Sequence, residues 1–134
     1  MRINNLLVLK KALFGFAICW TVIIAFLCLI TFSELPSLPV SGADKYVHVT
    51  LHFAFVMLWG FYVSLTQNEI RIAKIIRLVI LSILYGIVIE VLQEFFTTTR
   101  QADILDVLAN FTGAILALMA FVLMKRQKPT GPRL

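Results

Sequence analysis

The sequence has little charge and an excess of apolar residues. Only 14% of its 134 residues are charged, whereas 60% are hydrophobic. A soluble domain of this length could not bury so much apolar surface. The composition therefore excludes a soluble globular protein and favours a single domain whose solvent is the lipid bilayer.

Cysteine is also scarce, and the common catalytic motifs are missing. Cys19 and Cys28 lie nine residues apart in one apolar run. On a helix they are separated by about 14 Å along the axis, too far for a disulfide. The sequence has no H-E-x-x-H, C-x-x-C, G-x-S-x-G or Walker motif. No motif calls for a cofactor, and the residues leave open whether the protein is an enzyme.

Four apolar segments are long enough to cross the ~30 Å hydrocarbon core of a bilayer. They cover residues 12–33, 46–66, 75–96 and 103–124. The first segment follows two lysines, as in a signal peptide, but its apolar core is too long and no cleavage site follows, so we expect a retained anchor. The sequence predicts an all-α membrane protein with a four-transmembrane-helix bundle over 12–124, flanked by a tail at 1–11 and a basic tail at 125–134.

The basic residues predict how the bundle is oriented. Of the twelve lysine and arginine residues, nine lie in the two tails or between the second and third segments, and a tenth, Arg77, lies near the start of the third segment. Four spans place these regions on one side, and the positive-inside rule puts that side in the cytoplasm, with both termini. Lys45 and Arg100 fall on the outer side. The net charge of +5 then reports topology and requires no nucleic-acid partner.

Polar residues recur at spacings of three and four near the outer ends of the last three segments, which places them on one face of each helix. An ionised group at the middle of a membrane helix costs ~2.5–3.5 kcal/mol on insertion scales. We therefore expect these faces to point into the bundle and to converge. The candidate ligand-binding residues are Asp44, Lys45, His48, Glu90, Gln93, Arg100, Asp103, Asp106 and Asn110.

Several of these residues also have a structural interpretation. "SGAD" resembles a capping box, with Ser41 as N-cap and Asp44 in the first turn. Asp103 and Asp106 fit the N-cap and third residue of the fourth helix in the same way. His52 is expected to be a buried imidazole with a backbone or hydroxyl partner.

Three stretches together resemble a known family. They are "DKYVH" at 44–48, "GIVIEVLQEFF" at 86–96 and "RQADILDVLANFTGAILA" at 100–117. Their combination resembles the VanZ-like family of small bacterial membrane proteins, named for a glycopeptide-resistance accessory factor. The resemblance implies a multi-pass protein of the bacterial cytoplasmic membrane, with a link to the cell envelope and to teicoplanin-type antibiotic resistance.

Three hypotheses about function follow. In the first, Lys45, His48 and Arg100 hold the anionic headgroup of an envelope lipid or lipid-linked precursor, and the acidic residues orient them. In the second, the protein is an intramembrane enzyme acting on a lipid phosphate or envelope precursor. His48 and Glu90, with Asp106, then serve as catalytic acid–base or metal-binding groups. In the third, the polar network only ties three helices together. The oligomeric state is left open.

Overall fold

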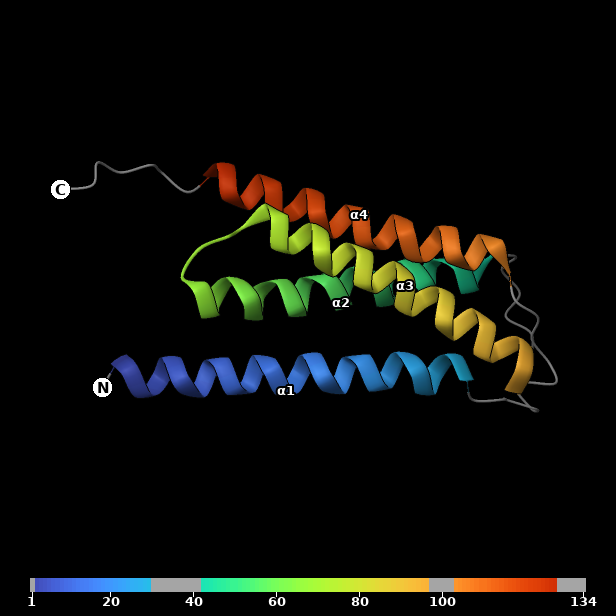
Figure 1. Ribbon diagram of the computed structural model, residues 1–134, viewed down its shortest axis with the longest axis horizontal. Helices are drawn as coiled ribbons and strands as arrows, with labels where there is room; N and C mark the ends of the chain where they lie inside the picture. Colours follow the sequence, from blue (N-terminus) through green and yellow to red (C-terminus); the bar gives the residue numbers. More distant parts are fainter. Residues whose placement is uncertain (1, 30–41, 97–102, 128–134) are drawn as a thin grey trace.

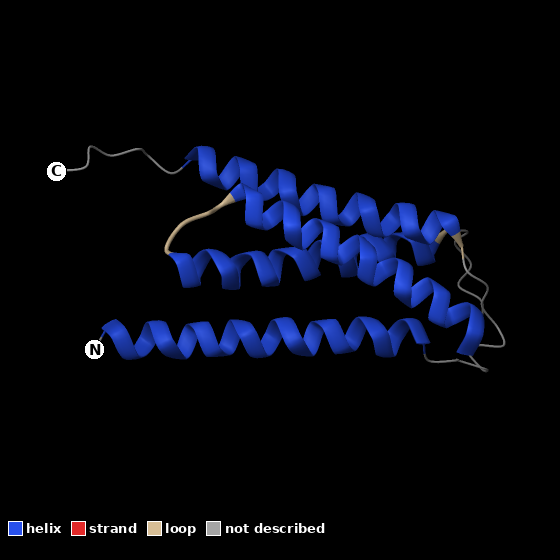
Figure 2. Cartoon of the chain, viewed as in Figure 1, coloured by secondary structure: helices blue, strands red, loops and turns tan. Residues whose placement is uncertain are grey.

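The computed structural model describes residues 2–29, 42–96 and 103–127, and all of its regular structure is helical (Figures 1 and 2). The four helices are α1 (Arg2–Leu29), α2 (Ala43–Gln67), α3 (Ile72–Phe96) and α4 (Ile104–Gln127). Each contains a segment long and apolar enough to span a membrane. The prediction of an all-α protein with four apolar membrane helices is confirmed.

The helix bounds differ from the predicted apolar segments mainly at the N-terminus. Helix α1 begins at Arg2, inside the predicted tail, and residues 30–33 of the first predicted segment lie outside the described residues. Leucine and lysine both favour helix. The helix therefore begins well before the apolar run that starts at residue 12, and it includes Lys10 and Lys11. Asn68 is the C-cap of α2: its φ is 56°, and its backbone N–H donates to the Ser64 carbonyl.

The helices form a bundle in which α2, α3 and α4 are closely packed and α1 is added on one side. Helix α2 packs most extensively against α4, α3 packs against both, and α1 packs against α2 and α3. A Cβ added at Gly113 of α4 would clash with the backbone carbonyl of Val49, so glycine permits the close approach of α2 and α4.

The two ends of the bundle differ in what they contain. Figure 1 shows the start of α1, the end of α4 and the α2–α3 connection at one end, here called the tail end. The ends of α1 and α3 and the starts of α2 and α4 form the opposite end, here called the site end. Which end faces the cytoplasm stays a prediction from the basic residues.

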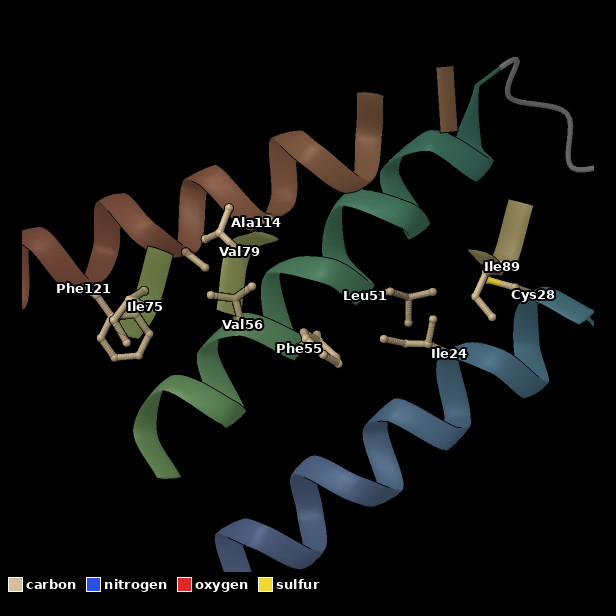
Figure 3. Close-up of a cluster of buried hydrophobic side chains, with 11 residues drawn as sticks. Ile24, Cys28, Leu51, Phe55, Val56, Ile75, Val79, Ile89, Ala114 and Phe121 are labelled. Atoms are coloured by element: carbon tan, nitrogen blue, oxygen red, sulfur yellow. The ribbon is translucent and has the colours of Figure 1, made fainter. Parts of the chain in front are cut away.

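The core draws on all four helices, as Figure 3 shows for Ile24 of α1, Leu51 and Val56 of α2, Ile89 of α3 and Phe121 of α4. Many other large apolar side chains point outward on every helix. Such continuous apolar exposure marks a membrane surface, because lipid tails solvate these groups as well as a protein core does.

Hydrogen bonds attach α1 to its neighbours. The Trp20 indole N–H donates to the Leu51 carbonyl at 3.0 Å, and the Tyr85 hydroxyl donates to the Thr21 carbonyl at 2.6 Å. The Trp59 indole N–H donates to the Thr21 hydroxyl at 3.2 Å. Without water in the bilayer core, polar side chains find partners on neighbouring helices, and here they fix α1 against α2 and α3.

Candidate functional site

Lys45 links the first turn of α2 to the start of α4. Its Nζ lies 2.9 Å from Asp44 Oδ2, 2.5 Å from Asp103 Oδ2 and 2.8 Å from Asp106 Oδ1. The ammonium group donates hydrogen bonds to Asp44 and Asp103, and its contact with Asp106 Oδ1 is an ion pair. The lysine side chain is 26% exposed, so the three carboxylates hold it at the edge of the bundle.

Asp103 has two roles, one for each carboxylate oxygen. Its Oδ1 accepts a hydrogen bond of 2.8 Å from the backbone N–H of Leu105, which confirms the prediction that it is the N-cap of α4. Its Oδ2 contacts Lys45. The hydrogen bond from the Lys45 ammonium, together with that from the Leu105 N–H, holds the pKa of the Asp103 carboxyl below its usual value.

The predicted capping box of α2 differs from the observed helix start. The N-cap is Gly42, with a φ of 84° that favours glycine, and no side chain caps it. Ser41, the predicted N-cap, lies outside the described residues, and α2 begins one residue later than that prediction required. Asp44 is nevertheless in the first turn, where a negative charge is favourable.

A buried layer lies beneath Lys45. His48 and Asn110 are only 3% and 1% exposed. His48 Nδ1 lies 3.1 Å from Asn110 Oδ1. Because an amide oxygen accepts, this hydrogen bond assigns the proton to Nδ1 and leaves the lone pair on Nε2. Nε2 lies 3.7 Å from Asp106 Oδ2, so it faces a carboxylate without a close contact.

Glu90 brings a second carboxylate to this layer from α3. The residue is 3% exposed. Its Oε2 accepts a hydrogen bond of 3.3 Å from the backbone N–H of Asp103. Within the described part of the chain its Oε1 is buried and accepts no hydrogen bond, and His48 Nδ1 is 3.9 Å away. An unpartnered carboxylate oxygen in such a place is costly and calls for an explanation.

These residues form a compact set of possible metal ligands. One ring nitrogen of His48, one oxygen of Glu90 and one oxygen of Asp106 all lie within 4.8 Å of one another. The same oxygen and nitrogen atoms could instead move protons, because the imidazole and the carboxylates are close neighbours. The geometry therefore allows cation binding, proton transfer or both.

Neighbouring residues shape this layer. A Cβ added at Gly86 would come within 2.6 Å of Asn110 Nδ2, so glycine leaves the room that the Asn110 side chain needs. His52 Nδ1 lies 2.8 Å from the Ser82 hydroxyl, which confirms the expected hydroxyl partner. Sequence reasoning missed Ser82. It lies four residues before Gly86 and eight before Glu90, so the polar face of α3 could have been followed back to it.

Most of the predicted site residues that the structure describes come together. Gln93 turns its amide nitrogen toward α1, where it donates to the Cys28 carbonyl at 2.7 Å, and Arg100 lies outside the described residues. In the described part of the cluster, four carboxylates surround one ammonium group and one histidine. The residues that converge are Asp44, Lys45, His48, Glu90, Asp103, Asp106 and Asn110.

Fold and site define a class: a multi-pass membrane protein with four candidate spans and a buried His–Glu–Asp cluster at one end of the bundle. The family model of VanZ/LLP1 matches residues 6–125. The chain therefore belongs to the VanZ/LLP1 family. Neither the search of curated proteins nor the search of solved structures gave a match.

Proposed function

We propose that the site end binds the phosphate-bearing headgroup of an envelope lipid or lipid-linked precursor at the outer face of the bacterial cytoplasmic membrane. One observation carries the proposal: charged groups from three helices gather at one end of an otherwise apolar bundle. Lys45 is partly exposed there, while His48 and Glu90 lie buried beneath it. This arrangement offers a headgroup a polar site that lipid tails do not reach.

Cation chemistry supports a phosphate as the ligand. Lys45 supplies an ammonium group, which would bind phosphate as a point charge in place of one of its three carboxylate partners. Arg100 follows the end of α3 by four residues and precedes Asp103 by three, so the chain carries a second cation between the two helices that supply Glu90 and Asp106. A guanidinium group binds phosphate through two parallel hydrogen bonds.

A link to teicoplanin tolerance forms part of the proposal. Membership of the VanZ/LLP1 family motivates it. A protein that holds an envelope lipid or precursor headgroup at the outer face changes which precursors a glycopeptide reaches. This step requires the outward orientation that the basic residues predict.

Binding is tested with the purified full-length protein in detergent, by native mass spectrometry. The probes are phosphatidylglycerol, a polyprenyl phosphate and neutral diacylglycerol. We expect the protein to retain more of each phosphate lipid than of diacylglycerol. The phosphate lipid that is retained more strongly identifies the source of the phosphate. Arg100→Lys keeps the positive charge but cannot make two parallel hydrogen bonds to a phosphate. We therefore expect this variant to retain phosphate lipids about tenfold less strongly.

The matched control is Arg126→Lys, which makes the same change at an exposed position of the tail end. It should retain phosphate lipids like the wild type. Both variants are then scored for teicoplanin tolerance in cells at equal protein abundance. Equal retention of all three lipids by the wild type contradicts the proposal, and so does unchanged retention in Arg100→Lys.

A second candidate is an enzyme acting on the same lipid phosphate. The observation that favours it is the free lone pair of His48 Nε2 beside the Asp106 carboxylate, which suits a general base. Phosphorus NMR of the lipid mixture separates the two functions. A new phosphorus resonance that is lost in His48→Gln indicates catalysis, whereas retained and unaltered lipid indicates binding.

A further inference from the structure

We propose that His48, Glu90 and Asp106 bind a divalent transition-metal cation, with Zn²⁺ and Mn²⁺ as the candidates. Binding of the ion stands on these residues alone. The proposed role of the ion is to allow a phosphate to bind beside the carboxylates. This role rests on the proposed headgroup function. Such an ion would offset part of the negative charge of the described cluster, whose four carboxylates outnumber its one ammonium group.

His48 is prepared as a ligand by its hydrogen bond to Asn110. Nδ1 is engaged at 3.1 Å by the amide oxygen, and Nε2 keeps its lone pair on the side of Asp106. Histidines that bind metals usually donate their other ring N–H to a carbonyl or carboxylate, which fixes the tautomer and the ring orientation. Asn110 has this second role here.

The two carboxylates follow the same pattern, in which one oxygen is held by the protein and the other faces the cluster. Asp106 Oδ1 forms an ion pair with Lys45 at 2.8 Å, without a hydrogen bond in the described part of the chain, and Oδ2 lies 3.7 Å from His48 Nε2. Glu90 Oε2 accepts the Asp103 N–H, which leaves the buried Oε1 with no hydrogen bond in the described part of the chain. A cation supplies the partner that Oε1 lacks.

The spacing of the donor atoms fits an ion after a small contraction. They lie within 4.8 Å of one another. Ligands bound at ~2.0–2.2 Å to one ion are about 3–3.5 Å apart, so the widest separation must shorten by up to about 1.3–1.8 Å. One imidazole and two carboxylates suit Zn²⁺ and Mn²⁺ better than Mg²⁺, which prefers oxygen alone. Three protein ligands leave a coordination position that a phosphate oxygen can fill.

The competing interpretation is a protonated His48 that balances the two carboxylates without metal. In that case both ring N–H groups should make short charge-assisted hydrogen bonds of ~2.7–2.9 Å. The observed separations are 3.9 Å from Nδ1 to Glu90 and 3.7 Å from Nε2 to Asp106, and Nδ1 is closest to a neutral amide. The cluster is therefore more open than an ion-paired imidazolium requires.

The test uses the full chain in detergent, with any polyhistidine tag removed and bound metal stripped by a chelator. Zn²⁺ and Mn²⁺ binding are measured by calorimetry, and metal content by mass spectrometry after dialysis. We expect one equivalent per chain. Glu90→Gln should weaken binding by ~100-fold or more, and Asn110→Ala by the ~10–100-fold typical of an outer-shell change. Glu94→Gln is the matched control on the same helix and should bind like the wild type.

A second measurement does not depend on any variant folding. Pulsed electron paramagnetic resonance of Mn²⁺ bound to the wild type should show one coordinated imidazole nitrogen, since only His48 lies in the cluster. A wild type that binds less than one equivalent overturns the proposal. Equal affinity in Glu90→Gln and Glu94→Gln does so as well, and so does bound Mn²⁺ without imidazole coupling.

Phosphate probes separate this inference from the proposed function. Binding of inorganic phosphate and of phosphatidylglycerol is measured with and without one equivalent of Zn²⁺. We expect the ion to strengthen both about tenfold or more. If the ion binds but neither phosphate probe does, the metal site stands and the headgroup proposal fails. If both probes bind equally well without the ion, the proposed role of the ion is wrong.

Discussion

Charged side chains are more exposed at the tail end of the bundle than at the site end. At the tail end, Glu69 and Arg71 form an ion pair with side chains that are 52% and 58% exposed. At the site end, the His48 and Glu90 side chains are 3% and 4% exposed and face each other without a hydrogen bond. Water solvates the first pair, whereas water does not reach the second pair, which must be stabilised by other groups.

This difference in exposure distinguishes charges that set the orientation of the protein in the membrane from charges that form a site. An exposed ion pair contributes ~0–1 kcal/mol, so the charges of the tail end are compatible with a role in topology alone. Burying an ion costs several kcal/mol even after relaxation, so a buried cluster needs partners inside the protein or a ligand. A function should therefore be sought at the site end, and not at the more basic tail end.

The largest expected effect concerns which end is outside. A reporter that is active only in the cytoplasm should be fully active when fused after Leu134 and inactive when inserted at Ser37. The reason is the ten-to-two division of basic residues between the two sides. The measurement is reporter activity at equal protein abundance. The reverse pattern would place the site end in the cytoplasm and remove the outer-face proposal.

A smaller effect should follow from removing one cation at each end. Lys45→Met leaves three carboxylates close together without their shared ammonium group, and we expect a loss of ~1.5–3 kcal/mol in the free energy of unfolding, because the group is only partly buried. Arg71→Met removes only an exposed partner and should cost ~0–1 kcal/mol. Unfolding of the purified protein in mixed micelles measures both. Equal losses in the two variants would mean that the ends do not differ.

The smallest effect concerns the pH dependence of the Lys45–Asp103 contact. The hydrogen bond from Lys45 depresses the pKa of folded Asp103 below the ordinary value of 3.8, so the contact stabilises the fold above that pH and is lost as pH falls through the folded pKa. Asp103→Ser keeps an N-cap oxygen but loses the charge. The melting temperatures of wild type and Asp103→Ser should therefore differ at pH about 7 and converge below pH about 3.8.

A melting-temperature difference that stays constant over this pH range would show that the Asp103 charge does not stabilise the fold. Asp103→Asn serves as the control for capping, because asparagine caps helices about as well as aspartate. It should behave like Asp103→Ser. A difference between these two variants would report on capping, and not on the contact with Lys45.

The class of the protein and the polar residues of the site end could be predicted from the amino-acid sequence. Apolar runs of membrane length specify four helices, because a bilayer leaves a backbone few other ways to satisfy its hydrogen bonds. Polar residues at helical spacing, such as Asp106 and Asn110, must face inward, because lipid penalises them. Both conclusions depend on local periodicity and on the solvent, so no tertiary contact was needed to reach them.

The contacts between particular atoms depend on how the helices pack. The sequence could not show that Lys45 is shared by three carboxylates, that Gln93 turns toward α1, or that Glu90 keeps one oxygen without a hydrogen bond in the described part of the chain. These facts depend on the rotation and depth of helices far apart in the chain. Small residues at the crossings, such as Gly113 of α4, set that packing, and sequence periodicity does not encode it.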